Sequence, residues 1–242
     1  MRTLTIGLGY WGSKLAERLV GLVGYDDARG ADLRVMDWHY QGVDLKRFGR
    51  LVATDYHELL DQTDACIVAT PPASHFEIAR DCLLAGKHVL VEKPLTLKAS
   101  EARQLVELAR ERRLTLMVDS TWEYHDACVK RLAGLNDSSG TPVLSWRNHR
   151  EATTPEGLLW TQGPHPVALM LRAFHDKLPD VVAGQRNERQ ADLLYRFGNN
   201  NVRVVLEWVE REMPAARTIV VPGRGWLRHD RVLFDAAQHA PS

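Results

Sequence analysis

The sequence predicts an α/β protein in which a domain with a parallel sheet (residues 1–120) is followed by a smaller, mainly antiparallel α+β domain (residues 121–242). Three observations predict this class. Short apolar runs alternate with amphipathic stretches up to about residue 120, a pattern typical of β-α-β units and a parallel sheet. Four strand-like segments then follow one helix, which indicates an antiparallel sheet with a helix on one face. The boundary has no linker-like composition, so we expect close packing of the two parts.

In the first domain, strands and helices are expected in alternation. Apolar residues at helical spacing mark the first helix. The paired prolines Pro71 and Pro72 end the strand over residues 65–70, and Gly86 ends the helix over residues 74–85. We expect strands over residues 4–9, 32–37, 65–70, 88–92 and 114–119, and helices over residues 13–23, 57–62, 74–85 and 100–113.

In the second domain, the order of elements changes. Two helices, separated by one strand, precede a run of strands that stops soon after residues 223–235. We expect helices over residues 126–135 and 165–174, and strands over residues 142–150, 180–187, 191–198, 202–210 and 217–223.

Composition and charge exclude several classes of protein. Hydrophobic residues are 45% and charged residues 26% of the chain, an ordinary globular mixture rather than a disordered, collagen-like or coiled-coil one. The 31 Lys and Arg residues balance the 31 Asp and Glu residues, so we expect neither a nucleic-acid nor a membrane partner. No apolar run approaches the length of a membrane span, and the N-terminus has no apolar region typical of a signal peptide.

Cysteine usage points to the cytoplasm. Cys66, Cys82 and Cys128 cannot build a disulfide framework, and no CxxC pair is present for zinc. We therefore predict a protein of a reducing cytoplasm without a metal site.

A glycine loop follows the first expected strand. Gly7, Gly9 and Gly12 fit the pattern GxGxxG between a strand and a helix, which is the context that this motif requires in a Rossmann fold. The first glycine permits a tight turn, the second lets the backbone approach a pyrophosphate, and the third allows close helix–strand packing. We predict a dinucleotide site that includes Tyr10 and Trp11 from the same loop. The alternative is a plain glycine turn.

Asp37 ends the second expected strand, 25 residues after Gly12. A carboxylate there accepts hydrogen bonds from the ribose hydroxyls of the adenosine and repels a 2′-phosphate. Neither Lys nor Arg follows it directly, since Trp38 and His39 come next. The sequence therefore favours NAD(H) over NADP(H). The alternative is a solvated aspartate at a strand end.

A second candidate segment follows the strand over residues 65–70. Ligands of open α/β sheets bind beyond the carboxyl ends of strands, so we expect Thr70 and Pro71 to touch the cofactor. His75 is a further candidate for cofactor binding. For Ser74 and His75, capping of the next helix is the alternative role.

Glu92, Lys93 and Pro94 follow the strand over residues 88–92. With the glycine loop and the segment TPPASH in the same order, the chain resembles the Gfo/Idh/MocA oxidoreductases, a family that includes glucose-fructose oxidoreductase and inositol dehydrogenase. The resemblance implies that Glu92 and Lys93 border the cofactor, that Lys93 orients the reacting oxygen, and that the Lys93–Pro94 bond is cis. Without the family, a lysine at a strand end is usually a surface residue.

The segment Trp160–Pro166 resembles a branch of this family that acts on sugars and nucleotide sugars. The resemblance implies that His165 is the acid or base, a role that suits an imidazole. Thr161 stands where family members commonly carry an aspartate, and Pro166 replaces a second one. A structural histidine at a helix start is the alternative.

Other side chains are candidates for substrate binding. Residues 121–125 also resemble the sugar branch. The substrate candidates are Tyr124, Arg150 and Thr161, and Arg147 or Arg150 is suited to an anionic substrate group.

Residues and resemblance together predict an NAD(H)-dependent oxidoreductase. It interconverts a secondary alcohol and a ketone, or an imine and an amine, on a sugar-like or other small polar metabolite. The resemblance also implies a homo-oligomer, a dimer or tetramer, although the chain is short for the family and this puts the usual pocket and oligomer in question. Two alternatives stay open: a dinucleotide-binding regulatory or scaffold protein without turnover, and an enzyme of a specialised pathway that uses this scaffold for non-redox chemistry.

Overall fold

The structure is a computed structural model of the 242-residue chain. It describes residues 1–31, 51–132, 135, 140–149, 157–175, 177–210, 212–213, 215–222 and 225–229. The chain divides into two compact units, Met1–Asp119 and Ser120–Ser242, and each has its own sheet. The sequence places this boundary after residue 120.

The first unit is built on a parallel sheet, as predicted. Its six strands lie in the order β3-β2-β1-β4-β5-β6, and every pair is parallel. From β1 the chain winds to β3 on one side, and from β4 it winds to β6 on the other. The switch point, where open α/β sheets bind their ligands, therefore lies between β1 and β4. The strands are β1 (Thr3–Ile6), β2 (Ala28–Ala31), β3 (Leu51–Ala53), β4 (Ala65–Val68), β5 (His88–Glu92) and β6 (Leu116–Asp119).

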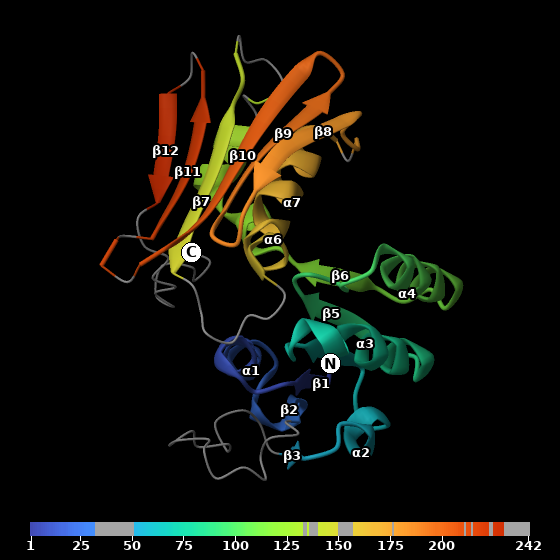
Figure 1. Cartoon of the computed structure of the whole chain (residues 1–242). Helices are drawn as coiled ribbons and strands as arrows, with labels where there is room; N and C mark the ends of the chain where they lie inside the picture. The colour runs from blue at the N-terminus through green and yellow to red at the C-terminus, as the bar shows by residue number, and fades with distance from the viewer. Residues whose placement is uncertain are drawn as a thin grey trace. The chain divides into compact units, whose positions relative to one another are not determined.

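Helices flank this sheet, with α3 and α4 beside β5 and β6 in Figure 1. Strands that are covered by helices on both faces read as continuous apolar runs, which explains why the successive residues Ile67 and Val68 of β4 are both buried. Cys66 and Val68, together with Leu4 and Ile6 of β1, belong to the core of this unit. The helical elements are α1 (Tyr10–Val23), η1 (Tyr25–Asp27), α2 (His57–Leu60), η3 (Pro72–Ser74), α3 (His75–Leu84) and α4 (Ala99–Glu111).

One expectation about the first unit needs correction, and one strand was missed. Helix α1 begins at Tyr10 rather than at residue 13, because the helix starts inside the glycine loop. The strand beside β1 is Ala28–Ala31, and the expected strand over residues 32–37 lies outside the described residues. The segment ARGA has little strand propensity, so only its backbone pairing with β1 reveals it.

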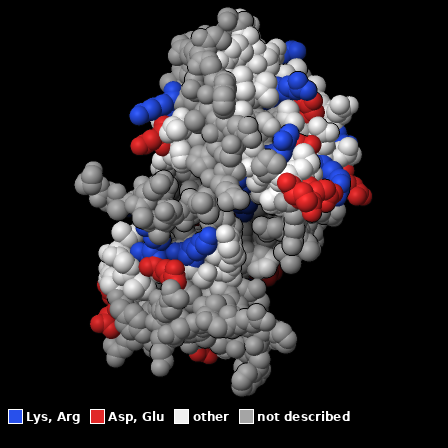
Figure 2. Space-filling model, turned by 90° about the vertical axis from the view of Figure 1, so that its left-hand side faces the viewer, with Lys and Arg blue, Asp and Glu red and all other residues white. Residues whose placement is uncertain are grey.

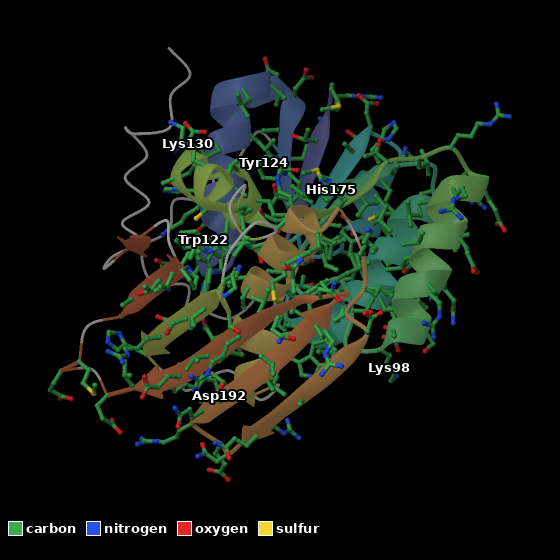
Figure 3. The ribbon with its side chains drawn as sticks, turned by 90° about the horizontal axis from the view of Figure 1, so that it is seen from above. Lys98, Trp122, Tyr124, Lys130, His175 and Asp192 are labelled. Carbon is green, nitrogen blue, oxygen red and sulfur yellow. The ribbon has the colours of Figure 1, made fainter. Side chains whose placement is uncertain are left out.

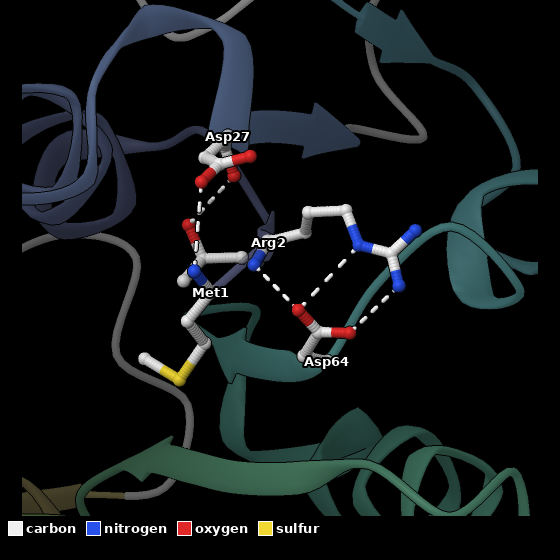
Figure 4. A network of polar contacts seen from close by, with 5 residues as sticks. Met1, Arg2, Asp27 and Asp64 are labelled. Carbon is white, nitrogen blue, oxygen red and sulfur yellow. Dashed lines mark hydrogen bonds and ion pairs between the residues drawn. The ribbon is translucent and has the colours of Figure 1, made fainter.

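An ion pair joins the starts of β1 and β4. The Arg2 amide and guanidinium both donate to Asp64, at 2.7 Å and 2.8 Å (Figure 4). These hydrogen bonds hold the pKa of Asp64 well below its usual range, at about 2. They lie at the amino ends of the strands, so they support the sheet at the edge opposite the glycine loop.

The second unit is built on a mainly antiparallel sheet, as predicted. Its six strands lie in the order β12-β11-β7-β10-β9-β8, and β7 with β10 is the single parallel pair. The tight β9–β10 turn places Gly198 at φ 60°, in the left-handed region that favours glycine. The strands are β7 (Val143–His149), β8 (Val181–Arg186), β9 (Gln190–Phe197), β10 (Asn200–Val209), β11 (Ala216–Val221) and β12 (Gly225–His229).

One face of this second sheet packs against helices (Figure 1). Leu144 and Trp146 of β7, Leu206 of β10 and Ile219 of β11 are buried in a single core on that face. The helical elements are η4 (Thr121–Tyr124), α5 (Asp126–Leu132), α6 (Gly157–Gln162) and α7 (Pro164–Ala173). Helix α6 was not expected from the sequence.

The other face of the second sheet carries paired charges. Arg147 donates to Glu207 at 2.9 Å, and Arg203 donates to Asp192 at 2.8 Å. On the face shown in Figure 2, basic and acidic side chains likewise lie next to one another. Arg147 is one of the two arginines expected to bind an anionic substrate group. Its charge is already neutralised by Glu207 within the sheet.

Candidate functional site

The glycine loop connects β1 to α1 at the switch point of the first sheet. Gly7 has φ 90°, in the region that favours glycine, and a Cβ there would lie 2.8 Å from the Ala69 backbone. A Cβ at Gly12 would lie 1.7 Å from the Gly7 carbonyl oxygen. The loop therefore packs directly on the end of β4, and the close helix–strand packing expected of the third glycine is present.

The start of α1 suits an anion. Gly9 is the N-cap residue, no side chain caps the helix, and no acidic residue lies in its first turn. Helix N-termini carry partial positive charge and amide donors, which bind phosphate groups. The donor set and the close backbone approach thus fit a dinucleotide pyrophosphate.

Exposed aromatic side chains follow in the same loop. Tyr10 is 70% and Trp11 is 38% exposed, and their rings meet edge to face. Lys14 donates to the Tyr10 hydroxyl at 2.9 Å and lies over its ring. Sequence reasoning missed Lys14, although its position four residues after Tyr10 on a helix signals the contact.

Thr70 and Pro71 follow β4 at the same edge of the sheet. The Ser74 hydroxyl lies 2.8 Å from both the Thr70 hydroxyl and the Pro71 carbonyl oxygen. Ser74 does not cap α3 with its side chain. The turn after β4 is therefore held by its own hydrogen bonds.

His75 connects two loops of this edge instead of facing outward. It is 1% exposed, and its ring nitrogens lie 2.8 Å from the carbonyl oxygens of Thr70 and Pro94. The direct cofactor contact expected for His75 finds no support, because both nitrogens are occupied inside the protein. Its burial at the start of α3 joins the end of β4 to the loop after β5.

Glu92 ends β5 and Lys93 follows it, next to the turn after β4. The Lys93–Pro94 peptide bond is cis, as the resemblance implied. The Lys93 amide donates to the Glu92 carboxylate at 3.0 Å. Burial, with the charge of Asp119 beside it, raises the pKa of Glu92 to about 7. A group that titrates near neutral pH therefore adjoins Lys93.

The predicted acid–base residue belongs to the second unit. His165 is the second residue of α7, and its Nδ1 is buried. The Thr161 hydroxyl of α6 donates a hydrogen bond to the Gly157 carbonyl oxygen at 2.7 Å, so this hydrogen bond is internal to the helix. Tyr124 of η4 is 62% exposed (Figure 3).

The predicted site residues thus fall into three groups. One group lies at the carboxyl edge of the first sheet: Gly7, Gly9, Tyr10, Trp11, Gly12, Thr70, Pro71, His75, Glu92 and Lys93. Tyr124, Thr161 and His165 lie on the helical elements of the second unit. Asp37 and Arg150 lie outside the described residues. Within the described part of the chain, no group of three or more metal-ligating side chains occurs, and no helix is long and apolar enough to span a membrane.

Comparison with known proteins identifies the family. The model of an oxidoreductase family with an NAD-binding Rossmann fold, Gfo/Idh/MocA, matches residues 1–120. Through these residues, the chain belongs to the Gfo/Idh/MocA oxidoreductase family. Its first unit is therefore the NAD-binding domain of this family, and the glycine loop, Gly7–Gly12, lies in that domain.

Two curated relatives match part of this Gfo/Idh/MocA chain. UDP-N-acetylglucosamine 3-dehydrogenase of Acidithiobacillus ferrooxidans is 41% identical over 69 residues, which cover 28% of this chain and 22% of that protein. The scyllo-inositol 2-dehydrogenase (NADP(+)) of Bacillus subtilis is 30% identical over 136 residues, 49% of this chain and 38% of that protein. The matched segments thus span well under two thirds of either relative.

A solved structure extends the similarity to the second unit. GenD2 from gentamicin A biosynthesis, in complex with NAD, is 25% identical with a TM-score of 0.78. The match covers 95% of this chain and 72% of that chain. Both units of this Gfo/Idh/MocA chain therefore have counterparts in a protein that binds NAD.

Proposed function

We propose that this protein is an NAD(H)-dependent oxidoreductase that interconverts a secondary alcohol and a ketone, or an amine and an imine, on a sugar-like or other small polar metabolite. The observation that carries the proposal is the glycine loop. It presents an uncapped helix N-terminus at the switch point, where the fold binds its ligands. Two relatives are named as dehydrogenases of a nucleotide sugar and of an inositol, and these names support a sugar-like substrate.

Two side chains carry the chemistry in this proposal. A bound nicotinamide cofactor supplies hydride transfer. Lys93 orients the reacting oxygen, and its ammonium stabilises the negative charge that develops there. His165 accepts a proton from the carbinol or returns one to the carbonyl. The hydroxyl of Thr161, engaged within α6, brings no negative charge to support a charged His165.

NAD(H) is the proposed cofactor in preference to NADP(H). The preference rests on Asp37 and on the absence of Lys or Arg directly after it in the sequence. One relative is named for NADP(+), so members of this family differ in the choice. We further propose that the protein acts in the cytoplasm as a homo-oligomer, without a nucleic-acid or membrane partner.

The first experiment is a titration with NADH, followed by quenching of tryptophan emission, with NADPH as the comparison. Trp11 lies in the glycine loop and is partly exposed, so it is placed to report binding. We expect tight binding of NADH and weak binding of NADPH. If neither cofactor binds, the oxidoreductase proposal fails and a non-redox role takes its place.

The second experiment separates turnover from binding alone. Lys93→Ala is compared with Lys98→Ala, a change at an exposed lysine that pairs with Glu101 at the start of α4. With a panel of nucleotide sugars and inositols, Lys93→Ala is expected to lose most turnover and keep NADH affinity. Binding of NADH without turnover by the unmodified protein would favour the regulatory or scaffold alternative.

A further inference from the structure

Arg217 occupies a core position of the second sheet. On β11, Ile219 and Val221 are 2% and 1% exposed and point into the core under the helices. Arg217 lies two residues before Ile219, so its side chain is on the same face. Its partner on β7 is Trp146, which is 1% exposed. The alternation along β11 predicts an apolar residue at this position, and the chain has an arginine instead.

The Trp122 ring lies close to this guanidinium. The Arg217 Cζ lies 6.0 Å from the centre of the Trp122 ring, a cation–π distance. Trp122 meets Trp146 edge to face, with ring centres 5.9 Å apart. Figure 3 places Trp122 between α5 and the strands of the second sheet. A positive charge thus lies among indole rings of the helical face.

The charge has no counter-ion in the described part of the chain. The buried Nε of Arg217 and the buried indole nitrogen of Trp146 have no hydrogen-bond acceptor there. Burial lowers the pKa of Arg217. On the opposite face of the same sheet, Arg147 and Arg203 are both paired with carboxylates. Arg217 therefore differs from them in its face and in having no counter-ion among the residues that the structure describes.

An uncompensated charge at a core position opposes folding, since the apolar neighbours cannot replace its hydration. Strained or costly groups of this kind cluster at functional sites, where a ligand uses them. A guanidinium matches the geometry of a carboxylate or a phosphate, and an indole N–H adds a further donor. The Arg217 side chain is only partly buried, whereas its Nε and the Trp146 indole nitrogen are buried, so an anion would first contact the exposed part of the guanidinium.

We propose that Arg217, with Trp122 and Trp146, forms an anion-binding subsite for the carboxylate or phosphate group of a small-molecule ligand. The subsite lies within the second unit alone. Binding there needs neither the glycine loop nor turnover, so the proposal stands apart from the oxidoreductase function. If the oxidoreductase proposal holds, the subsite selects substrates that carry a negative charge.

The test uses isothermal titration of the full chain with three probes. Glucuronate supplies a carboxylate, UDP-glucose supplies phosphates, and glucose is the uncharged comparison. We expect one of the two anions to bind and glucose not to bind. Arg217→Met is expected to weaken that binding by about tenfold or more, because the charge is lost while the volume is kept. Arg217→Lys keeps the charge and is expected to lose less anion affinity than Arg217→Met.

Matched measurements keep the test decisive. Arg203→Met, on the opposite face, is expected to leave anion binding unchanged. The thermal midpoint of Arg217→Met is expected to equal or exceed that of the unmodified protein, because an unpaired charge is removed. A lower midpoint together with unchanged anion affinity, or no anion binding by the unmodified protein, overturns the proposal. NADH affinity, measured in parallel, reports separately on the oxidoreductase function.

Discussion

Glu92 and Asp119 lie opposite each other as register partners at the carboxyl ends of β5 and β6. Parallel strands bring these two carboxyl groups to the same edge of the sheet, directly before Lys93. Burial and the neighbouring charge of Asp119 raise the pKa of Glu92 to about 7, while the charge of Lys93 acts in the opposite direction. A carboxyl group beside the proposed catalytic lysine thus holds its proton in a pH range where free glutamate is ionised.

This relationship predicts a pH-dependent stability. Between the ordinary pKa of glutamate and about 7, the folded protein keeps a proton on Glu92 that the unfolded chain releases. The free energy of unfolding should therefore fall as the pH rises through this window, by up to about 3 kcal/mol. Glu92→Gln should remove this loss. Urea unfolding at a series of pH values checks this expectation, with Glu58→Gln, at an exposed position of α2, as the control. Parallel profiles for Glu92→Gln and the unmodified protein would contradict the expectation.

The glycine loop predicts a contrast between two glycines of α1. Gly12→Ala places a methyl group on the Gly7 carbonyl oxygen, whereas a Cβ at Gly21 meets nothing within 4 Å. Gly12→Ala should destabilise the first unit by about 2 kcal/mol or more and weaken NADH binding. Gly21→Ala should stabilise it by about 0.5–1 kcal/mol, because alanine favours the helix interior. Thermal unfolding and NADH titration measure both. Equal effects of the two changes on stability and NADH affinity would show that the close approach of Gly12 to the Gly7 carbonyl oxygen is unimportant for both.

His75 is predicted to act as a positioning residue for the loops after β4 and β5. His75→Leu leaves at least one of the Thr70 and Pro94 carbonyl groups without its donor, because a neutral imidazole donates through one nitrogen, at a cost of about 1–3 kcal/mol in unfolding free energy. NADH affinity should fall as well, since both loops border the proposed site. His75→Gln retains a donor, so its losses of stability and of NADH affinity should be smaller than those of His75→Leu. Urea unfolding and NADH titration report the two effects. An unchanged affinity in a stable His75→Leu variant would limit the residue to a structural role.

Local sequence patterns were sufficient for most elements. The strand over residues 88–92 is β5 with the same bounds, because its apolar run is buried and needs no distant signal. The pattern failed at Ala28–Ala31, where the strand is held by pairing with β1 rather than by its own propensity. It also failed at α6, a short helix whose Leu158 and Gln162 are buried by tertiary packing. Elements that depend on distant partners carry weak local signals.

The sequence by itself determined the family, the glycine loop and the residues expected at the carboxyl edge of the first sheet, because each follows from short motifs with local geometry. Only the tertiary structure decided what individual side chains contact. It turned His75 inward onto two carbonyl groups, paired Arg147 with Glu207, and placed Arg217 beside Trp122. Most of these contacts join residues far apart in the chain, and the pairing of strands and the burial of their faces bring such residues together.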